Sequence, residues 1–236
     1  MLLLGIDTAT RRVGVVLANE NGLLGRVEIG GPADDGPPRH AEVLTPAIAY
    51  ACEQCNVSLA QCSVIAVGIG PGMFTGLRVG VTTAKSLAQS LRIPVIPVPS
   101  LDLLAYPLRH TRSLIVPAID ARRHEIYYAI YRPVPGGVQR VSDYELATPA
   151  DLVCELEARG EEALLCGDGI TRFRDAFSEL ERVEFAGAAH AAPSLSALAE
   201  LAAARYEREE FNAPSDVLPM YLRKSDAELS WDRTKV

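Results

Sequence analysis

The sequence carries one order of predicted secondary structure twice, and this duplication restricts the fold more than any other feature. The first half predicts strands over 2–6, 13–18 and 23–29, then a helix, a strand over 64–69 and a helix over 77–91. The second half predicts strands over 114–119, 125–131 and 138–146, a helix over 149–159, a strand over 163–166 and a helix around 173–180. The repeat indicates a duplicated α/β fold made of two βββαβα halves.

We expect these halves to cover residues 1–110 and 111–211, followed by a polar C-terminal tail over 212–236 with little core signal. Gly30–Pro38 is rich in Gly, Pro and Asp, which is typical of a mobile surface loop. Two starts remain open for the next helix. Either Thr45 caps a helix that begins at Pro46, or a longer helix from about residue 41 is kinked at Pro46.

A glycine-rich turn, Gly68–Gly72, lies between the strand over 64–69 and the helix over 77–91. A strand, a glycine turn and a helix place unpaired N–H groups at a helix N-terminus, which suits an anion. Gly70 and Gly72 tolerate positive φ and leave room for a ligand, and Thr75 is a candidate N-cap. The alternative is a tight turn that packs the helix on the sheet, and the residues alone leave both open.

Composition excludes several classes of protein. The chain has 236 residues, a net charge of −7 and five cysteines. An acidic chain is a poor binder of nucleic acid by itself, because affinity for phosphates comes mainly from Lys and Arg. The odd cysteine count disfavours a disulfide framework, and the sequence shows neither a signal peptide nor a long apolar run. We therefore expect a cytoplasmic protein that is not in a membrane and meets RNA only through a partner.

Five stretches together resemble the TsaB family, also called YeaZ. Gly70–Arg78 reads GPGMFTGLR, close to the family signature GPGSFTGLR, and the other stretches match in the same order: 5–10, 39–42, 119–123 and 219–223. The resemblance spans nearly the whole chain. It implies the duplicated ribonuclease-H-like fold of the actin, sugar-kinase and heat-shock ATPase superfamily, which agrees with the internal repeat. Met73 replaces the usual Ser and removes a hydroxyl beside the glycine turn.

The resemblance also implies a function. Members of the family are non-catalytic subunits of the complex that makes the tRNA base N6-threonylcarbamoyladenosine. A paralogous catalytic subunit of the TsaD type performs the transfer, and a small ATPase of the TsaE type assists it. For this chain we therefore expect no catalytic residue and no metal, tRNA contact only through the complex, and at most ATP or ADP at the interface of the complex. Two alternatives are a working kinase or ATPase and, with less support, a metallopeptidase.

The residues argue against both alternatives. Superfamily ATPases use glycines after the first strand of each half so that the backbone approaches phosphate, but Asp120 is followed by Ala-Arg-Arg. The aspartates at these turns are expected to accept bonds from nearby backbone N–H groups instead. The candidate nucleotide- or anion-binding residues are Asp7, Gly70, Gly72, Thr75, Asp120, Gly167 and Gly169. No histidine pair has metal-ligand spacing, and Cys52 and Cys55 form a C-x-x-C that we interpret as packing residues.

Two helices are apolar on more than one face. Residues 43–51 contain no charged side chain, and the helix over 77–91 has only Arg78, Lys85 and Gln89 as long polar side chains. One face can cover the sheet, so the second needs another cover. We predict a homodimer when the chain is alone and a competing heterodimer with the catalytic paralogue. The candidate interface residues are Val43, Leu44, Ala47, Ile48, Ala51, Arg78, Val81, Ala84, Lys85 and Ala88.

Overall fold

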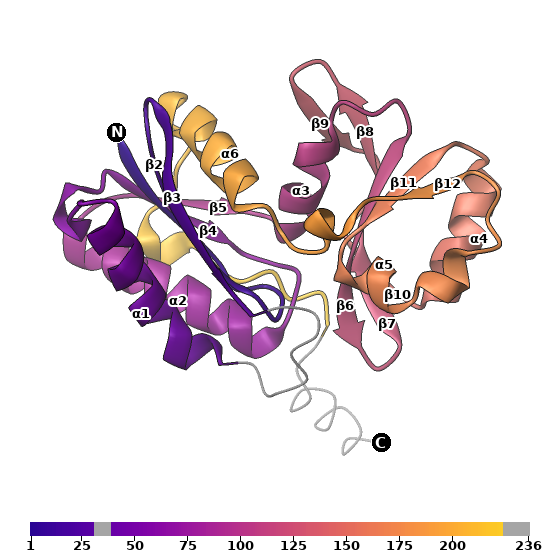
Figure 1. The fold of residues 1–236 in the computed structure, drawn as a ribbon, viewed down its shortest axis with the longest axis horizontal. Coiled ribbons are helices and arrows are strands. Elements are labelled where there is room, and N and C mark those ends of the chain that lie inside the picture. Colours follow the sequence, from indigo (N-terminus) through magenta and orange to yellow (C-terminus); the bar gives the residue numbers. More distant parts are fainter. Residues whose placement is uncertain (31–38, 224–236) are drawn as a thin grey trace.

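The computed structural model describes residues 1–30 and 39–223, which form two lobes side by side (Figure 1). The sheet of the first lobe has the strand order β3-β2-β1-β4-β5. Its strands are β1 (Leu2–Asp7), β2 (Val13–Asn19), β3 (Gly22–Ile29), β4 (Val64–Gly68) and β5 (Val95–Val98). β1, β2 and β3 are antiparallel, whereas β4 and β5 run parallel to β1. The three strands predicted at the start of the chain are confirmed, and they are antiparallel.

The second lobe repeats this order as β10-β7-β6-β11-β12. Its strands are β6 (Leu114–Arg122), β7 (Glu125–Tyr128), β10 (Glu145–Ala147), β11 (Ala163–Cys166) and β12 (Val183–Phe185), with an added hairpin of β8 (Tyr131–Val134) and β9 (Gly137–Arg140). The predicted duplicated α/β fold is confirmed. The continuous strands expected over 125–131 and 138–146 are wrong, because the chain changes partner: β7 pairs with β10, and β8 pairs with β9.

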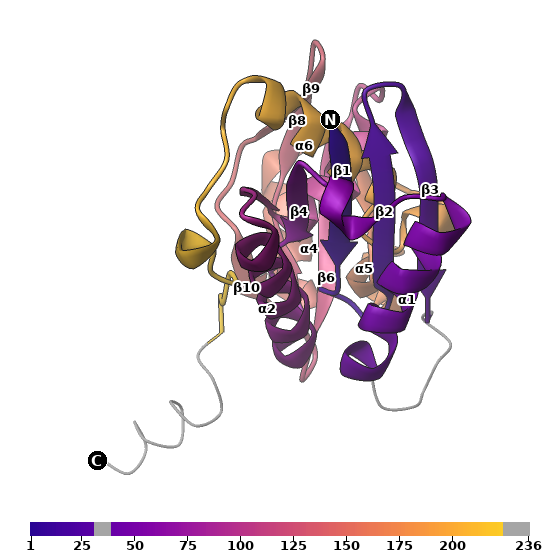
Figure 2. The same cartoon turned by 90° about the vertical axis from the view of Figure 1, so that its left-hand side faces the viewer.

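Helices cover both faces of each sheet, and the two lobes exchange one helix. On the first sheet, α1 (His40–Gln54) and α2 (Phe74–Leu91) cover one face, and α6 (Leu195–Glu207) covers the other (Figure 2). On the second sheet, α4 (Pro149–Arg159) and α5 (Asp168–Arg172) cover one face. The opposite face receives α3 (Ser100–Ala105), which follows the last strand of the first sheet. Each lobe therefore completes the core of the other, so α6 lies apart from the half to which sequence order assigns it.

One helix start that the sequence left open is now decided, and two other helix boundaries differ from those expected. α1 contains Pro46 in its interior, so the longer-helix alternative holds. α2 begins at Phe74 with Met73 as an N-cap that makes no side-chain bond, which places Thr75 inside the first turn rather than at the cap. The helix expected around 173–180 is instead α5 followed by a short 3₁₀ turn over Arg174–Phe177, because Gly167 with φ of 99° starts the helix earlier. None of the helices within 1–30 and 39–223 is long and apolar enough to cross a membrane.

Residues 212–223 are more than a polar tail. Asn212 exchanges two backbone hydrogen bonds with Val95 on the edge of the first sheet. Val217 is buried in the core beneath α2, and the Met220 N–H donates to the Ile69 carbonyl at 2.7 Å. The segment then reaches the second lobe, where Arg223 donates to the Ala121 carbonyl at 2.8 Å. This C-terminal strap ties the two lobes together. The rest of the expected tail, and residues 31–38 of the expected loop, lie outside the described residues.

Candidate functional site: a cleft between the lobes

The glycine turn before α2 is closed by the connection that follows β1. The Met73 N–H, at the start of the helix, donates to the Ala9 carbonyl at 2.7 Å. A Cβ on Gly72 would overlap that same carbonyl oxygen. The Gly70 N–H donates to the Ser100 hydroxyl at 3.2 Å. The turn therefore uses its glycines for close packing, and the tight-turn alternative holds.

Asp7 is buried rather than presented to a ligand. Its Oδ1 accepts the Ala9 N–H at 3.2 Å, and its Oδ2 accepts the Ser100 hydroxyl at 3.1 Å. A Cβ on Gly68 would overlap the carboxylate, so this side of Asp7 has no free space. Burial raises the pKa of the Asp7 carboxyl to about 6, although both hydrogen bonds act to lower it. The expected bond to a backbone N–H is confirmed.

In the second lobe the carboxyl group with a raised pKa comes from a different element. Asp120 accepts the Arg122 N–H at 2.9 Å and lies 3.4 Å from the guanidinium groups of both Arg122 and Arg172. Asp168 on α5 is half-buried and accepts the Asp120 N–H at 3.0 Å. Burial raises the pKa of Asp168 to about 6. Gly167 and Gly169 pack tightly against the backbone of Ala118, so they serve helix packing and leave no cradle for phosphate.

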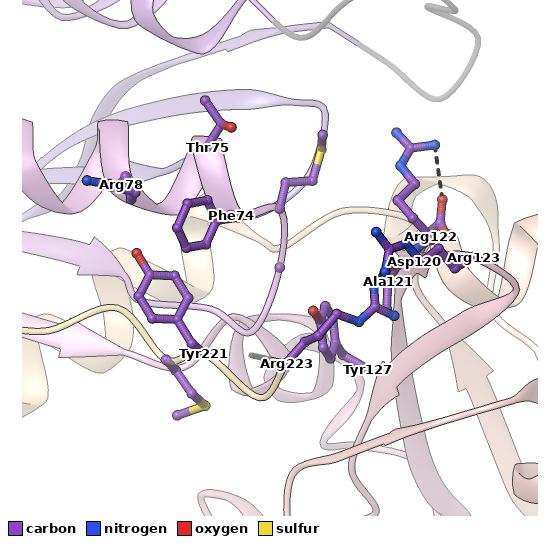
Figure 3. Close-up of a pocket in the computed structure, with 13 residues that line it drawn as sticks. Phe74, Thr75, Arg78, Asp120, Ala121, Arg122, Arg123, Tyr127, Tyr221 and Arg223 are labelled. Atoms are coloured by element: carbon purple, nitrogen blue, oxygen red, sulfur yellow. Dashed lines mark hydrogen bonds and ion pairs between the residues drawn. The ribbon is translucent and has the colours of Figure 1, made fainter. Parts of the chain in front are cut away.

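A cavity of about 670 Å³ lies between the lobes. Its lining combines the start of α2, the turn between β6 and β7, and the C-terminal strap (Figure 3). The lining residues are Gly72, Met73, Phe74, Thr75, Arg78, Asp120, Ala121, Arg122, Arg123, Tyr127, Met220, Tyr221 and Arg223. Of the predicted nucleotide- or anion-binding residues, only Gly72, Thr75 and Asp120 are brought together here.

The turn that lines this cavity has an unusual backbone. Arg122, Arg123 and His124 have φ of 64°, 54° and 60°, and none of them is glycine. The left-handed region costs such residues roughly 1–2 kcal/mol each. A two-residue hairpin turn of this geometry normally uses Asn or Gly. The chain accepts this cost where two arginine side chains reach the cleft.

Sequence reasoning missed most of this site. It noted Arg122 and Arg123 only as the residues that replace phosphate-binding glycines, and it did not select Phe74, Tyr127, Tyr221 or Arg223. A signal was present, because Phe74 lies in the GPGMFTGLR stretch, and Tyr221 and Arg223 lie in the matched stretch 219–223. Only the fold shows that these two stretches meet in space.

The other candidate chemistries lose their support. Within 1–30 and 39–223, no three residues of the His, Cys, Asp and Glu types cluster to hold a metal ion. Cys52 and Cys55 are free, and burial raises the pKa of Cys52. Burial also raises the pKa of the neighbouring Cys62 to about 11. Such thiols are poor nucleophiles, which agrees with a packing role.

Most of the predicted interface residues lie in the core, so that prediction is corrected. The buried members are Leu44, Ala47, Ile48, Ala51, Val81, Ala84 and Ala88. Their side chains cover the first sheet and are not available to a partner. Val43 and Lys85 are half-buried, and Arg78 is exposed. Lys85 donates to the Ser215 and Val217 carbonyls at 3.2 and 2.8 Å, so it holds the C-terminal strap.

Two mixed sheets of the same strand order, with an exchanged helix and closed glycine turns before α2 and α5, define the class: a duplicated ribonuclease-H-like protein of the actin-like ATPase superfamily. The model of the family "TsaD: tRNA N6-adenosine threonylcarbamoyltransferase" matches residues 37–231. The chain is 31% identical to the tRNA threonylcarbamoyladenosine biosynthesis protein TsaB of Bacillus subtilis, over 98% of each chain. The structure of YeaZ from Pseudomonas aeruginosa superposes with a TM-score of 0.78 at 25% identity, covering 94% of this chain and 99% of that one. The chain belongs to the TsaB (YeaZ) family.

A further similarity extends to the transferase itself. The tRNA N6-adenosine threonylcarbamoyltransferase of Saccharolobus islandicus is 35% identical over 107 residues, which are 42% of this chain and 32% of that protein.

Proposed function

We propose that this chain is the non-catalytic partner subunit of a complex that transfers threonylcarbamoyl to tRNA in the cytoplasm. The observation that carries the proposal is the combination of TsaB family membership with two closed glycine turns, one before α2 and one before α5. A Cβ on Gly72 would overlap the Ala9 carbonyl and one on Gly167 would overlap the Ala118 carbonyl, so backbone packing leaves these turns no room for phosphate. A chain that keeps the ATPase fold without room for phosphate at these turns fits a supporting subunit better than an enzyme that hydrolyses ATP.

The partner in this proposal is a catalytic subunit of the TsaD type. This chain is itself similar to such transferases, and related folds commonly pair through equivalent surfaces. A TsaE-type ATPase acts on the complex, ATP or ADP binds at most at its interface, and the chain alone forms a homodimer through the same surface.

We assign that surface to the outward face of α1 and α2, which pack beside each other. The exposed charged residues Glu42, Glu53 and Arg78 lie near the ends of the two helices. Between them, the exposed members that we select are Thr45, Ala49 and Tyr50 from α1, and Thr82 and Ser86 from α2. These side chains are uncharged, and four of the five are small, so a partner helix could approach closely. Tyr50 is 55% exposed and offers an apolar anchor of the kind that dominates binding energy.

The test is co-purification with the TsaD-type subunit, using charges placed on this face. Ala49→Glu and Thr82→Glu are expected to weaken both heterodimer and homodimer at least tenfold, because each buries an unpaired charge at the contact. Ala176→Glu, an exposed alanine of the second lobe, is the matched control and should change neither. Full partner binding by both folded variants would contradict the assigned surface. If neither the wild-type chain nor any variant binds the TsaD-type subunit, the proposed function is contradicted.

A further inference from the structure

One wall of the cleft is an aromatic platform. The rings of Phe74 and Tyr221 lie 4.9 Å apart between centroids, and the two residues are 44% and 45% exposed. Figure 3 shows them together on one side of the cavity, with Met220 of the strap next to Tyr221 in sequence. Exposed rings at the mouth of a cavity form a surface on which a planar ligand stacks.

The opposite wall carries an unused hydrogen-bond donor. Tyr127 is only 7% exposed and lines the cavity, yet its hydroxyl has no hydrogen-bond partner among the described residues. Burial raises the pKa of this phenol, so the hydroxyl keeps its proton and remains a donor at neutral pH. Because Tyr127 lines the cavity, its hydroxyl is available to donate a hydrogen bond to an acceptor on a ligand there.

The cavity is also positively charged in an acidic chain. Four arginines and a single aspartate line it, whereas the net charge of the chain is −7. Arg223 is held in place by the Ala121 carbonyl and by Glu125. Arg78 has no carboxylate partner within the described ranges and lies 5.2 Å from the centre of the Phe74 ring. Fixed guanidinium groups in a cleft attract phosphate and bind it with defined geometry.

We propose that this cleft binds a nucleoside monophosphate unit, with its base against Phe74 and Tyr221 and its phosphate toward Tyr127 and the arginines. A stacking platform beside a cationic wall is the combination that proteins use for unpaired nucleotides. The volume of about 670 Å³ suits a ligand of this size.

A metal-bound triphosphate does not fit the same residues. Asp120, the single carboxylate in the lining, is already paired with Arg122 and Arg172, and Asp7 is buried outside the cavity. The site therefore includes the turn after β6 but not the turn after β1, so it holds only one of the two turns that superfamily ATPases use for a triphosphate. Two sources supply the ligand chemistry: an unpaired nucleotide of RNA or a free mononucleotide. The RNA source rests on the proposed function, and we favour it because a subunit of a tRNA-modifying complex meets unpaired nucleotides there.

The test titrates the full chain with two probes at low salt. One is AMP, and the other is a labelled single-stranded pentaribonucleotide, with binding followed by calorimetry and fluorescence anisotropy. Both are expected to saturate weakly. Tyr127→Phe, which removes only one oxygen, and Tyr221→Ala should each weaken binding about tenfold. Arg78→Ala should weaken it and reduce its salt dependence. Arg112→Ala is the matched control. Arg112 is exposed just before the start of β6, at the end of the strand away from the cleft, and its substitution removes the same charge as Arg78→Ala.

Tighter binding of the pentaribonucleotide than of AMP would assign the site to RNA, and equal binding would assign it to a free mononucleotide. Either result supports the site without the TsaD-type subunit, so the proposed function is tested separately. The inference is overturned if neither probe saturates, or if the three cleft variants bind like wild type. It is also overturned if Arg112→Ala weakens binding as much as Arg78→Ala.

Discussion

The two lobes share one strand order but use the turn after their first strand in opposite ways. In the first lobe this turn is buried: Asp7 is 4% exposed, and the connection behind it packs into the glycine turn before α2. In the second lobe the equivalent turn is open, carries Arg122 and Arg123, and lines the cleft. The carboxyl group with a raised pKa there belongs to Asp168, from another element. Duplication preserved the sheets while the two turns diverged, one toward packing and one toward a charged surface.

The largest expected effect tests the closed turn of the first lobe. Gly72→Ala places a methyl group against the Ala9 carbonyl, which belongs to rigid backbone. We expect a loss of about 3 kcal/mol in the free energy of unfolding, measured by urea denaturation. Gly137→Ala in the second lobe is the matched control, because its nearest neighbour would be 3.9 Å away. Equal stability of the two variants would show that the first turn is not closed.

Each lobe has one carboxyl group with a raised pKa, Asp7 or Asp168, and this makes the free energy of unfolding depend on pH. The pKa values of Asp7 and Asp168 are raised from 3.8 to about 6, so the folded state binds more protons than the unfolded state between these values. Stability therefore falls as pH rises from about 4 to about 6, by up to about 3 kcal/mol for each acid.

Asp7→Asn should remove the contribution of the first lobe. We expect a net gain of about 2 kcal/mol at pH 7, after the loss of part of a hydrogen bond, and little change at pH 4. Asp168→Asn reports the second lobe in the same way, and unfolding curves at several pH values measure both. A loss of stability at pH 7 in Asp7→Asn would mean that the carboxylate is stabilised in the fold rather than penalised.

The smallest expected effect compares two helix ends. Arg92 caps the C-terminus of α2 with φ of 56°, whereas Gly160 caps the C-terminus of α4 with φ of 64°. Glycine adopts this left-handed conformation at less cost than arginine. Arg92→Gly should raise the free energy of unfolding by about 1 kcal/mol, and Gly160→Arg should lower it by a similar amount, both followed by thermal and urea denaturation. If Arg92→Gly lowered the free energy of unfolding and Gly160→Arg raised it, side-chain contacts at these positions would outweigh the backbone conformation.

Much of the fold could be predicted from sequence, because hydrophobic alternation and turn residues mark most elements locally. The prediction failed where distant contacts decide. Residues 127–131 are all buried, so they read as one strand, yet the chain changes partner within them. Nothing local shows that α3 and α6 each complete the opposite lobe, or that residues 212–223 return to the first sheet.

The site was harder to predict for the same reason. Its two walls come from segments more than forty residues apart, 72–78, 120–127 and 220–223, and no spacing rule joins them. For α1 and α2, the sequence showed more apolar and small residues than one face needs, but it did not show which of them face the sheet and which face outward. Ala84 and Ala88 face the sheet, whereas Thr82 and Ser86 face outward, and small residues fit either side.

The most direct test of the central claim is a reconstituted transfer reaction. Threonylcarbamoyl transfer to tRNA is measured with this chain alone, with the TsaD-type subunit and its TsaE-type ATPase, and with all components together. The account predicts no transfer and no ATP hydrolysis by this chain alone, and strong dependence of the other subunits on its presence. Turnover by the pure chain that is lost in Asp7→Ala, or full transfer without the chain, would contradict it.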